Sequence, residues 1–178
     1  RMGSSNSISA TVLTAKPWSS GYVNSSHDRQ MTDNAAGLII AAPSSGSGKT
    51  VVTLGLLRQF ARTGVAVSSA KVGPDYIDPA FHAIATGRPC RNLDTWAMRP
   101  ATLSSAIETL ADDGPIVCEG VMGLFDGARG VSGEADGSSA ALSRLTGWPA
   151  VLVVDASAQA ASAAAVVRGF ATHDAEVP

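Results

Sequence analysis

The segment that most constrains this chain is Ala-Pro-Ser-Ser-Gly-Ser-Gly-Lys-Thr, at residues 42–50. It follows an apolar run that predicts a strand over Leu38–Ala42, and it precedes a helix-like stretch, Val51–Thr63. A strand, a glycine-rich turn and a helix start form the arrangement that binds nucleotide phosphate, because a helix N-terminus favours an anion. Gly46 and Gly48 let the backbone turn closely enough for several N–H groups to face phosphate oxygens. The segment therefore predicts a bound nucleoside triphosphate.

Individual roles follow from the side chains of this loop. Lys49 supplies a positive charge for catalysis as well as binding, and the hydroxyl of Thr50 is placed to hold Mg²⁺. The usual pattern has a glycine where this chain has Pro43, and some deviant loops carry a lysine near positions 44 and 45, which are serines here. The predicted nucleotide contacts are Gly46, Ser47, Gly48, Lys49 and Thr50.

The composition fits one α/β domain with a sizeable core. The chain has 178 residues, 45% of them hydrophobic, and its formal charge of −2 gives no electrostatic reason to expect nucleic acid as a partner. No apolar run approaches the roughly 20 residues that span a bilayer, so we expect no membrane association. Cys90 and Cys118 form neither a metal-binding spacing nor a disulfide framework, which favours a reduced, cytoplasmic setting.

Hydrophobic periodicity alternates between strand and helix signals along the chain. This order predicts a doubly wound, mostly parallel sheet with helices on both faces, in which ligands lie beyond the carboxyl ends of the strands. The predicted strands are Leu38–Ala42, Val65–Val72, Ile116–Glu119 and Ala150–Asp155. The predicted helices are Val51–Thr63, Pro79–Thr86, Ala101–Asp112, Ser138–Thr146 and Ser157–Thr172.

The two ends of the chain differ from this pattern. Residues 1–36 are expected to be a disordered extension or a cloning leader, with an organellar transit peptide as the lesser alternative, because Arg1–Gln30 is rich in Ser, Thr and Asn. Residues 37–178 are expected to form the domain. The last residues, Ala-Glu-Val-Pro, stand where a further strand would begin. We therefore expect a sheet that is incomplete at the C-terminus, as in a fragment.

The segment Lys71–Pro79 places charged side chains at the end of the second predicted strand. Lys71 could neutralise charge that develops on a transferred phosphoryl group. Asp75 and Asp78 are expected to lie over the nucleotide site, where two carboxylates can share a cation or orient a substrate group. The alternative is structural, with Asp75 as a turn residue and Asp78 as a helix cap.

Glu119 ends the third predicted strand and is the expected acid of the Mg²⁺ site. Asp155 ends the fourth predicted strand and competes with Glu119 for this role, although it could equally cap the helix that follows.

A glycine-rich loop, residues 120–137, follows Glu119. The glycines at 120, 123 and 127 would allow backbone N–H groups to face an anionic substrate. Asp126 is a predicted substrate contact, with a turn role as the alternative, and Arg129 could bind a carboxylate or simply be exposed. His27, His82 and His173 show no partner spacing and receive no role. No Ser-His-Asp or Cys-His set is recognisable, so covalent acyl catalysis is not expected.

Four motifs in order carry a resemblance over about residues 38–178. Their sequences are Ala-Pro-Ser-Ser-Gly-Ser-Gly-Lys-Thr, Lys-Val-Gly-Pro-Asp-Tyr-Ile-Asp-Pro-Ala-Phe-His, Asn-Leu-Asp-Thr-Trp-Ala-Met and Glu-Gly-Val-Met-Gly-Leu-Phe-Asp-Gly. On these motifs the chain resembles the N-terminal, ATP-binding domain of the cobyrinic acid or hydrogenobyrinic acid a,c-diamide synthases. The dethiobiotin synthetases are similar more distantly.

The resemblance implies an ATP-dependent ligase of cobalamin biosynthesis that amidates the a and c acetate carboxylates of a corrinoid through an acyl phosphate. It implies that Thr50, Glu119 and Asp75 organise Mg²⁺, and that the substrate lies near Asp75, Tyr76, Asp78 and Asp126. Family members continue into a glutaminase domain that supplies ammonia and is absent from this sequence. A homodimer remains open.

Two alternatives to this reading remain. The first is an ATP-driven switch of the partitioning type, against which the serines at 44 and 45 argue. The second is an inactive truncated fragment. Whether the corrinoid carries cobalt, and whether it is instead another tetrapyrrole, are left open by the sequence.

Overall fold

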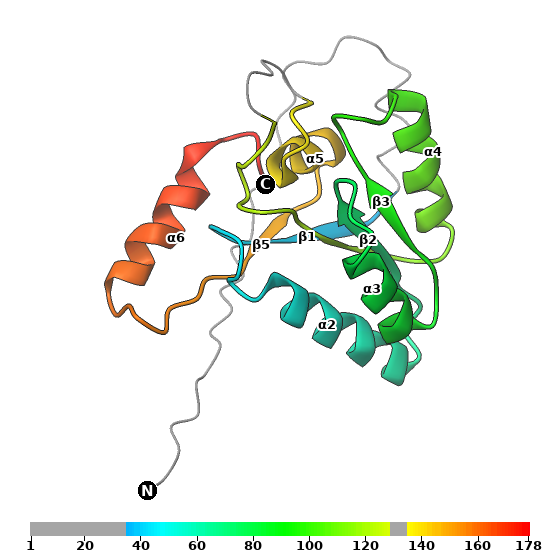
Figure 1. The fold of residues 1–178 in the computed structure, drawn as a ribbon, viewed down its shortest axis with the longest axis horizontal. Coiled ribbons are helices and arrows are strands. Elements are labelled where there is room, and N and C mark those ends of the chain that lie inside the picture. Colours follow the sequence, from blue (N-terminus) through cyan, green and yellow to red (C-terminus); the bar gives the residue numbers. More distant parts are fainter. Residues whose placement is uncertain (1–34, 129–134) are drawn as a thin grey trace, which may run out of the picture.

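The computed structural model describes residues 35–128 and 135–178. Over these ranges strands and helices alternate, as the periodicity predicts (Figure 1). The strands are β1 (Gly37–Ala41), β2 (Ser68–Val72), β3 (Cys90–Leu93), β4 (Ile116–Glu119) and β5 (Ala150–Leu152). The helices are α2 (Lys49–Thr63), α3 (Asp78–Thr86), α4 (Pro100–Ala111), α5 (Ser139–Thr146) and α6 (Ser162–His173).

The five strands form one sheet in the order β3-β2-β4-β1-β5, and every strand pairing in it is parallel. The predicted doubly wound sheet is thereby confirmed. The chain leaves β2 toward β3 at one edge of the sheet and leaves the adjacent strand β4 toward β5 at the opposite edge. Adjacent strands whose connections diverge in this way open a crevice at their carboxyl ends, where α/β proteins bind ligands.

Apolar side chains cover both faces of the sheet because successive residues of a strand point to opposite sides. Ile39 belongs to the larger core cluster, which includes residues of α4 and α5, whereas Ile40 belongs to the smaller one with Leu57 of α2. Figure 1 shows the corresponding layers, with α2 and α3 below the sheet and α4 and α5 above it. Helices therefore cover both faces, as predicted.

The predictions of four elements need correction. β2 begins at Ser68 rather than at Val65. β3 was not predicted, because its residues Cys-Arg-Asn-Leu contain no apolar run to signal a strand. β5 ends at Leu152 rather than at residue 155. α6 begins at Ser162, because residues 157–161 form turns before the helix starts.

Helix α6 lies beside the sheet and has no buried residue. Phe170 stacks on Phe125 with ring centroids 5.6 Å apart, and Asp174 pairs with Arg144 of α5 at 2.6 Å. The carbonyl of Pro178 accepts a hydrogen bond from the amide of Ala150. Among the described residues, none of the helices combines the length and the apolar character needed to cross a membrane.

Candidate functional site

The loop between β1 and α2 has the backbone shape that its glycines predict. Gly46 and Gly48 have φ angles of 80° and 94°, in the left-handed region that glycine adopts without strain. Gly48 is the N-cap of α2, so the helix begins at Lys49. The first N–H groups of a helix lack partners within it, and here they lie beyond the carboxyl end of the interior strand β1. The loop can accept an anion by its backbone alone.

Lys49 is held against the loop that follows β4. Its Nζ donates to the carbonyls of Met122, at 2.7 Å, and Ser44, at 3.2 Å. Met122 has a φ of 47°, a left-handed conformation that costs a non-glycine residue about 1 kcal/mol. Burial and the nearby Lys71 ammonium lower the pKa of Lys49 from its ordinary value. The ammonium therefore bridges two loops, and a phosphate could replace the carbonyls as its partner.

Glu119 is the centre of a buried polar cluster at the end of β4. Its side chain is 1% exposed. One oxygen, Oε1, accepts from Thr50 Oγ1 at 2.5 Å and lies 3.3 Å from Lys71 Nζ. The other, Oε2, lies 2.7 Å from His82 Nε2. Burial would raise the pKa of Glu119, but the hydrogen bonds from His82 and Thr50 and the charge of Lys71 hold it below its usual value.

Lys71 joins Glu119 to the segment that follows β2. Its Nζ lies 2.8 Å from Asp78 Oδ2, 4.0 Å from Asp75 Oδ2 and 3.0 Å from the carbonyl of Gly120. Burial lowers the pKa of this lysine, yet the bond to Asp78 and the charge of Glu119 raise it overall. Lys71 is therefore a fixed cation, and Asp78 is part of the same cluster as the nucleotide loop.

Asp75 and Tyr76 form the turn before α3. Asp75 Oδ1 accepts from the amides of Ile77, at 2.8 Å, and Asp78, at 3.2 Å, which is the turn role anticipated as the alternative. The side chain of Asn92 on β3 donates to the carbonyl of Asp75 at 2.6 Å. Tyr76 is 85% exposed. The turn thus presents Tyr76 outward and keeps Asp75 Oδ2 near Lys71.

The loop after Glu119 uses its glycines differently from the expectation. The amide of Gly120 donates to the carbonyl of Ile40 and that of Gly123 to Asp126 Oδ2, both at 2.9 Å, so these two amides do not face a substrate. A Cβ at Gly120 would come within 2.6 Å of Ser139 Oγ. Glycine is needed there for close packing. Asp126 has the turn role, and its substrate role stays a prediction.

One other predicted position that the structure describes lies apart from the cluster. Asp155 is exposed, and its Oδ1 accepts from the amide of Ser157 at 2.9 Å. The hydroxyl of Thr50 bonds to Glu119, so Glu119 is the acid that lies beside the nucleotide loop. Arg129 and His27 lie outside the described residues.

His82 is the residue of this cluster that the sequence analysis missed. It is 0% exposed, and its ring lies between Glu119 Oε2 and Cys90 Sγ, which is 3.4 Å from Nδ1. Burial lowers its pKa, but the bonds to Cys90 and Glu119 outweigh burial and raise the pKa to about 9. The signal available was helical spacing, since His82 stands four residues after Asp78 and so shares its face of α3.

The cluster fits Mg²⁺ only together with a bound nucleotide. Among residues 35–128 and 135–178, no three His, Cys, Asp or Glu side chains are grouped to hold a metal ion. Thr50 and Glu119 nevertheless bring a hydroxyl and a carboxylate oxygen within 2.5 Å of each other at the loop. Mg²⁺ commonly binds one or two carboxylates plus substrate phosphates and water, so these oxygens suit it.

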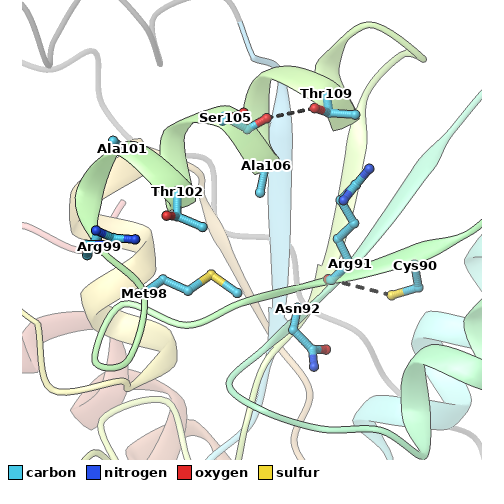
Figure 2. Close-up of a pocket in the computed structure, with 10 residues that line it drawn as sticks. All are labelled: Cys90, Arg91, Asn92, Met98, Arg99, Ala101, Thr102, Ser105, Ala106 and Thr109. Atoms are coloured by element: carbon cyan, nitrogen blue, oxygen red, sulfur yellow. Dashed lines mark hydrogen bonds between the residues drawn. The ribbon is translucent and has the colours of Figure 1, made fainter.

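A separate pocket of about 780 Å³ lies between β3 and α4 (Figure 2). Figure 2 shows Arg91 and Asn92 pointing to opposite sides of β3, with Thr102 and Ser105 on α4 across from Arg91. None of the described residues predicted for the nucleotide site lines this pocket. It is distinct from the Glu119 cluster.

Comparison with known proteins agrees with this geometry. The chain is 52% identical over 144 residues to the hydrogenobyrinate a,c-diamide synthase of Mesorhizobium japonicum, covering 80% of this chain and 33% of that protein. The synthase of the same name from Rhodobacter capsulatus is 49% identical over 148 residues, covering 83% and 34%. The one from Rhizobium meliloti is 50% identical over 142 residues, covering 79% and 32%.

The chain thus spans about a third of the length of these curated relatives, and its resemblance to the a,c-diamide synthases is confirmed. A family model described as the CobQ/CobB/MinD/ParA nucleotide binding domain matches residues 38–177. Except for Gly37 at the start of β1, that match covers every strand and helix of the structure, and it covers the whole Glu119 cluster. The chain therefore belongs to the CobQ/CobB/MinD/ParA nucleotide-binding domain family.

Proposed function

We infer that this chain is the ATP-binding part of a hydrogenobyrinate a,c-diamide synthase, an ATP-dependent carbon–nitrogen ligase of cobalamin biosynthesis. The observation that carries the inference is the continuous cluster Thr50–Glu119–Lys71–Asp78, which joins the nucleotide loop to the turn before α3. A reaction between ATP and a second substrate requires these two regions to meet. Because these relatives are hydrogenobyrinate a,c-diamide synthases, we propose hydrogenobyrinate rather than the cobalt-containing cobyrinate as that substrate.

The proposed reaction has two steps. An oxygen of the substrate acetate attacks the γ-phosphorus of ATP, the bond to the β-phosphate oxygen breaks, and an acyl phosphate and ADP form. Ammonia then attacks the acyl carbon, loses a proton and expels phosphate, which leaves the amide. Neither step requires a protein nucleophile, because phosphoryl transfer depends mainly on positioning and charge neutralisation.

Each described site residue has a proposed role in these steps. The backbone of residues 46–50 binds the phosphates of ATP, and Lys49 exchanges its carbonyl partners for a phosphate oxygen. Lys71, whose cation is fixed by Asp78 and Glu119, neutralises charge on the transferred group.

On the substrate side, Asp78 and Asp75 Oδ2, the oxygen that faces Lys71, orient the acetate. Tyr76 contacts the macrocycle from its exposed position. Asp126 and Arg129 are proposed as further contacts of the substrate.

Mg²⁺ is proposed to accompany ATP, held by Thr50 and Glu119 with Asp75 as a third candidate. Bound there, the ion would neutralise the phosphate charge and align the γ-phosphate. The chain's own contribution is to hold the Glu119 carboxylate ionised beside Thr50, which the depressed pKa of Glu119 supports.

Ammonia is proposed to come from glutamine through a further domain of the whole enzyme, a cytoplasmic protein. For the chain itself we propose ammonium as the nitrogen donor.

The test is phosphate release from ATP with ammonium, in the presence and absence of hydrogenobyrinate, together with mass spectrometry of the corrinoid. Substrate-dependent release with amidated product would support the function. Release without substrate, together with ATP-dependent dimerisation, would support the switch of the partitioning type instead.

Two variants test the assigned roles. Lys49→Ala should abolish substrate-dependent turnover, because it removes the charge that faces the phosphates. Glu119→Gln should retain ATP binding but slow turnover by roughly 100-fold or more, a loss typical of a charged group that stabilises the transition state. Full turnover in either variant would contradict the assignment.

A further inference from the structure

His82 is a fully buried polar residue that the proposed reaction does not use. It lies on α3, one turn after Asp78, and its backbone carbonyl accepts a hydrogen bond from the side chain of Thr86. Its two ring nitrogens face different partners, Glu119 Oε2 at 2.7 Å and Cys90 Sγ at 3.4 Å. The ring is therefore fixed at both ends, and one end is fixed to the candidate metal ligand.

The two oxygens of Glu119 have different surroundings. Oε1 faces the nucleotide loop and lies near Thr50 Oγ1 and Lys71 Nζ, while Oε2 faces away from the loop toward His82. The last torsion of a glutamate side chain is broad and only weakly restricted. A hydrogen bond from His82 to Oε2 removes this freedom and decides which oxygen is presented to Thr50.

Helix α3 thereby fixes two neighbouring charged side chains, Glu119, which bonds to Thr50 of the nucleotide loop, and Lys71, which lies beside Glu119. Its first residue, Asp78, holds Lys71, and one turn later His82 holds Glu119. Residues four apart on a helix share one face, so a single rigid element sets both contacts. Removing a group that hydrogen-bonds to a metal ligand and orients it commonly lowers metal affinity by about 10–100-fold.

The geometry points to His82 as a positioning residue for the cation that accompanies the nucleotide, acting by orienting the Glu119 carboxylate beside Thr50. This role rests on the proposed function, since it concerns the same site. It differs from a packing role, for which any side chain of similar volume would serve. It also differs from a role that works through Cys90, the other partner of the ring.

Two substitutions separate these roles. In His82→Gln the amide nitrogen can reach the position of Nε2 and keep the bond to Glu119, whereas in His82→Asn it can reach only the position of Nδ1, beside Cys90. Both replace the imidazole, so they share the loss of packing. Cys90→Ala is the matched control, because it removes the other partner and leaves Glu119 bonded.

The measurement is the dissociation constant of ATP by calorimetry, once with Mg²⁺ and once with EDTA. The quantity compared is the constant in EDTA divided by the constant in Mg²⁺, which gives the factor by which Mg²⁺ tightens ATP binding. His82→Gln and Cys90→Ala should keep the ratio of the wild-type chain, and His82→Asn should lower it by about 10-fold or more. A wild-type ratio in His82→Asn would overturn the role, as would an equal loss in His82→Gln. If the ATP affinity of the wild-type chain did not depend on Mg²⁺, the proposed function would be overturned as well.

A second measurement needs no variant and so does not depend on the folding of a substituted protein. Adding Mg²⁺ to the ATP-bound wild-type chain should shift the ring nitrogen resonances of His82 and leave those of His173 on α6 unchanged. His173 contacts Phe125 and is exposed, which makes it an internal reference. Unchanged His82 resonances would overturn the positioning role.

Discussion

In the Glu119 cluster, Lys71 serves both the proposed reaction and the stability of the fold. Lys71 is the only described cation within 4.0 Å of both Asp78 and Glu119, and its side chain is 5% exposed. A buried charge is tolerated when partners surround it, and removing one partner leaves the others uncompensated. The lysine proposed to act on phosphate is therefore also needed for folding.

Lys71→Met should destabilise the chain by about 3–5 kcal/mol, the range for breaking a buried ion pair from one side. The measurement is urea unfolding followed by circular dichroism. Asp78→Asn combined with Lys71→Met should recover part of the loss, because the double variant buries one charge fewer. Strictly additive losses in this double-mutant cycle would show that the two side chains do not interact energetically.

Gly120 is closely packed and Gly55 is not, and a pair of alanine substitutions tests this difference. Gly120→Ala should destabilise by about 1–3 kcal/mol, because its Cβ would lie 2.6 Å from Ser139 Oγ and 3.0 Å from the carbonyl of Ile40. Gly55→Ala, in the exposed middle of α2 with no atom within 4 Å of the new Cβ, should stabilise by about 0.5–1 kcal/mol. Thermal unfolding of both variants gives the comparison. A neutral Gly120→Ala would mean that the start of the loop can move away.

At the scale of elements, apolar patterning predicted most of the strands and helices. It failed for the polar strand at the edge of the sheet. β1 and β4 read as apolar runs because both faces of a central parallel strand are buried. β3 lies at the sheet edge with Arg91 exposed, so its sequence carries no such signal. The first turns of the predicted final helix were wrong for a related reason, since alanine-rich residues 157–161 favour a helix without burying any face.

The same limit explains which site residues could be predicted. The nucleotide loop and Glu119 are recognisable because a short, local order of residue types defines them. His82 acquires its role from Glu119, which is 37 residues away on another strand, and no local spacing records that contact. A histidine four residues after an acid on a short helix is a weak signal until the sheet order is known.

Helix α6 depends on few contacts, and one of them should respond to pH. Burial raises the pKa of Asp174, but the amide of Glu176 and the Arg144 guanidinium lower it overall. A carboxyl whose pKa is lowered by folding stabilises the fold above its unfolded pKa of about 3.9, and this contribution disappears as the pH falls through the folded value. Because the pair is partly exposed, its contribution should be only about 0.5 kcal/mol.

Asp174→Asn should therefore speed amide exchange in α6 at neutral pH by roughly twofold. It should have no effect at a pH below the folded pKa of Asp174. The readout is the ratio of variant to wild-type exchange rates at each pH, which cancels the intrinsic effect of pH on exchange. A ratio that does not change with pH would show that the Arg144–Asp174 pair does not hold the helix.

At the scale of the whole molecule, the sheet is covered on both faces although the chain spans about a third of its relatives' length. The larger core cluster joins strands β1, β2, β3 and β4 to helices α4 and α5, and the smaller one joins β1 and β4 to α2. The nucleotide loop extends from β1, which contributes to both. Nucleotide binding should consequently require the folded sheet and should raise the free energy of unfolding of the chain.

The chain should unfold in a single cooperative transition, and ATP with Mg²⁺ should raise its midpoint. A ligand that binds only the folded state at 100 times its dissociation constant adds about 2.7 kcal/mol, which corresponds to roughly 5–10 °C for a domain of this size. Lys49→Ala should unfold cooperatively without the shift, because Lys49 lies at the site while the core clusters are intact. Scanning calorimetry with and without nucleotide is the measurement. A broad, non-cooperative transition would favour the inactive fragment, whereas cooperative unfolding with no shift would separate a stable fold from the proposed nucleotide site.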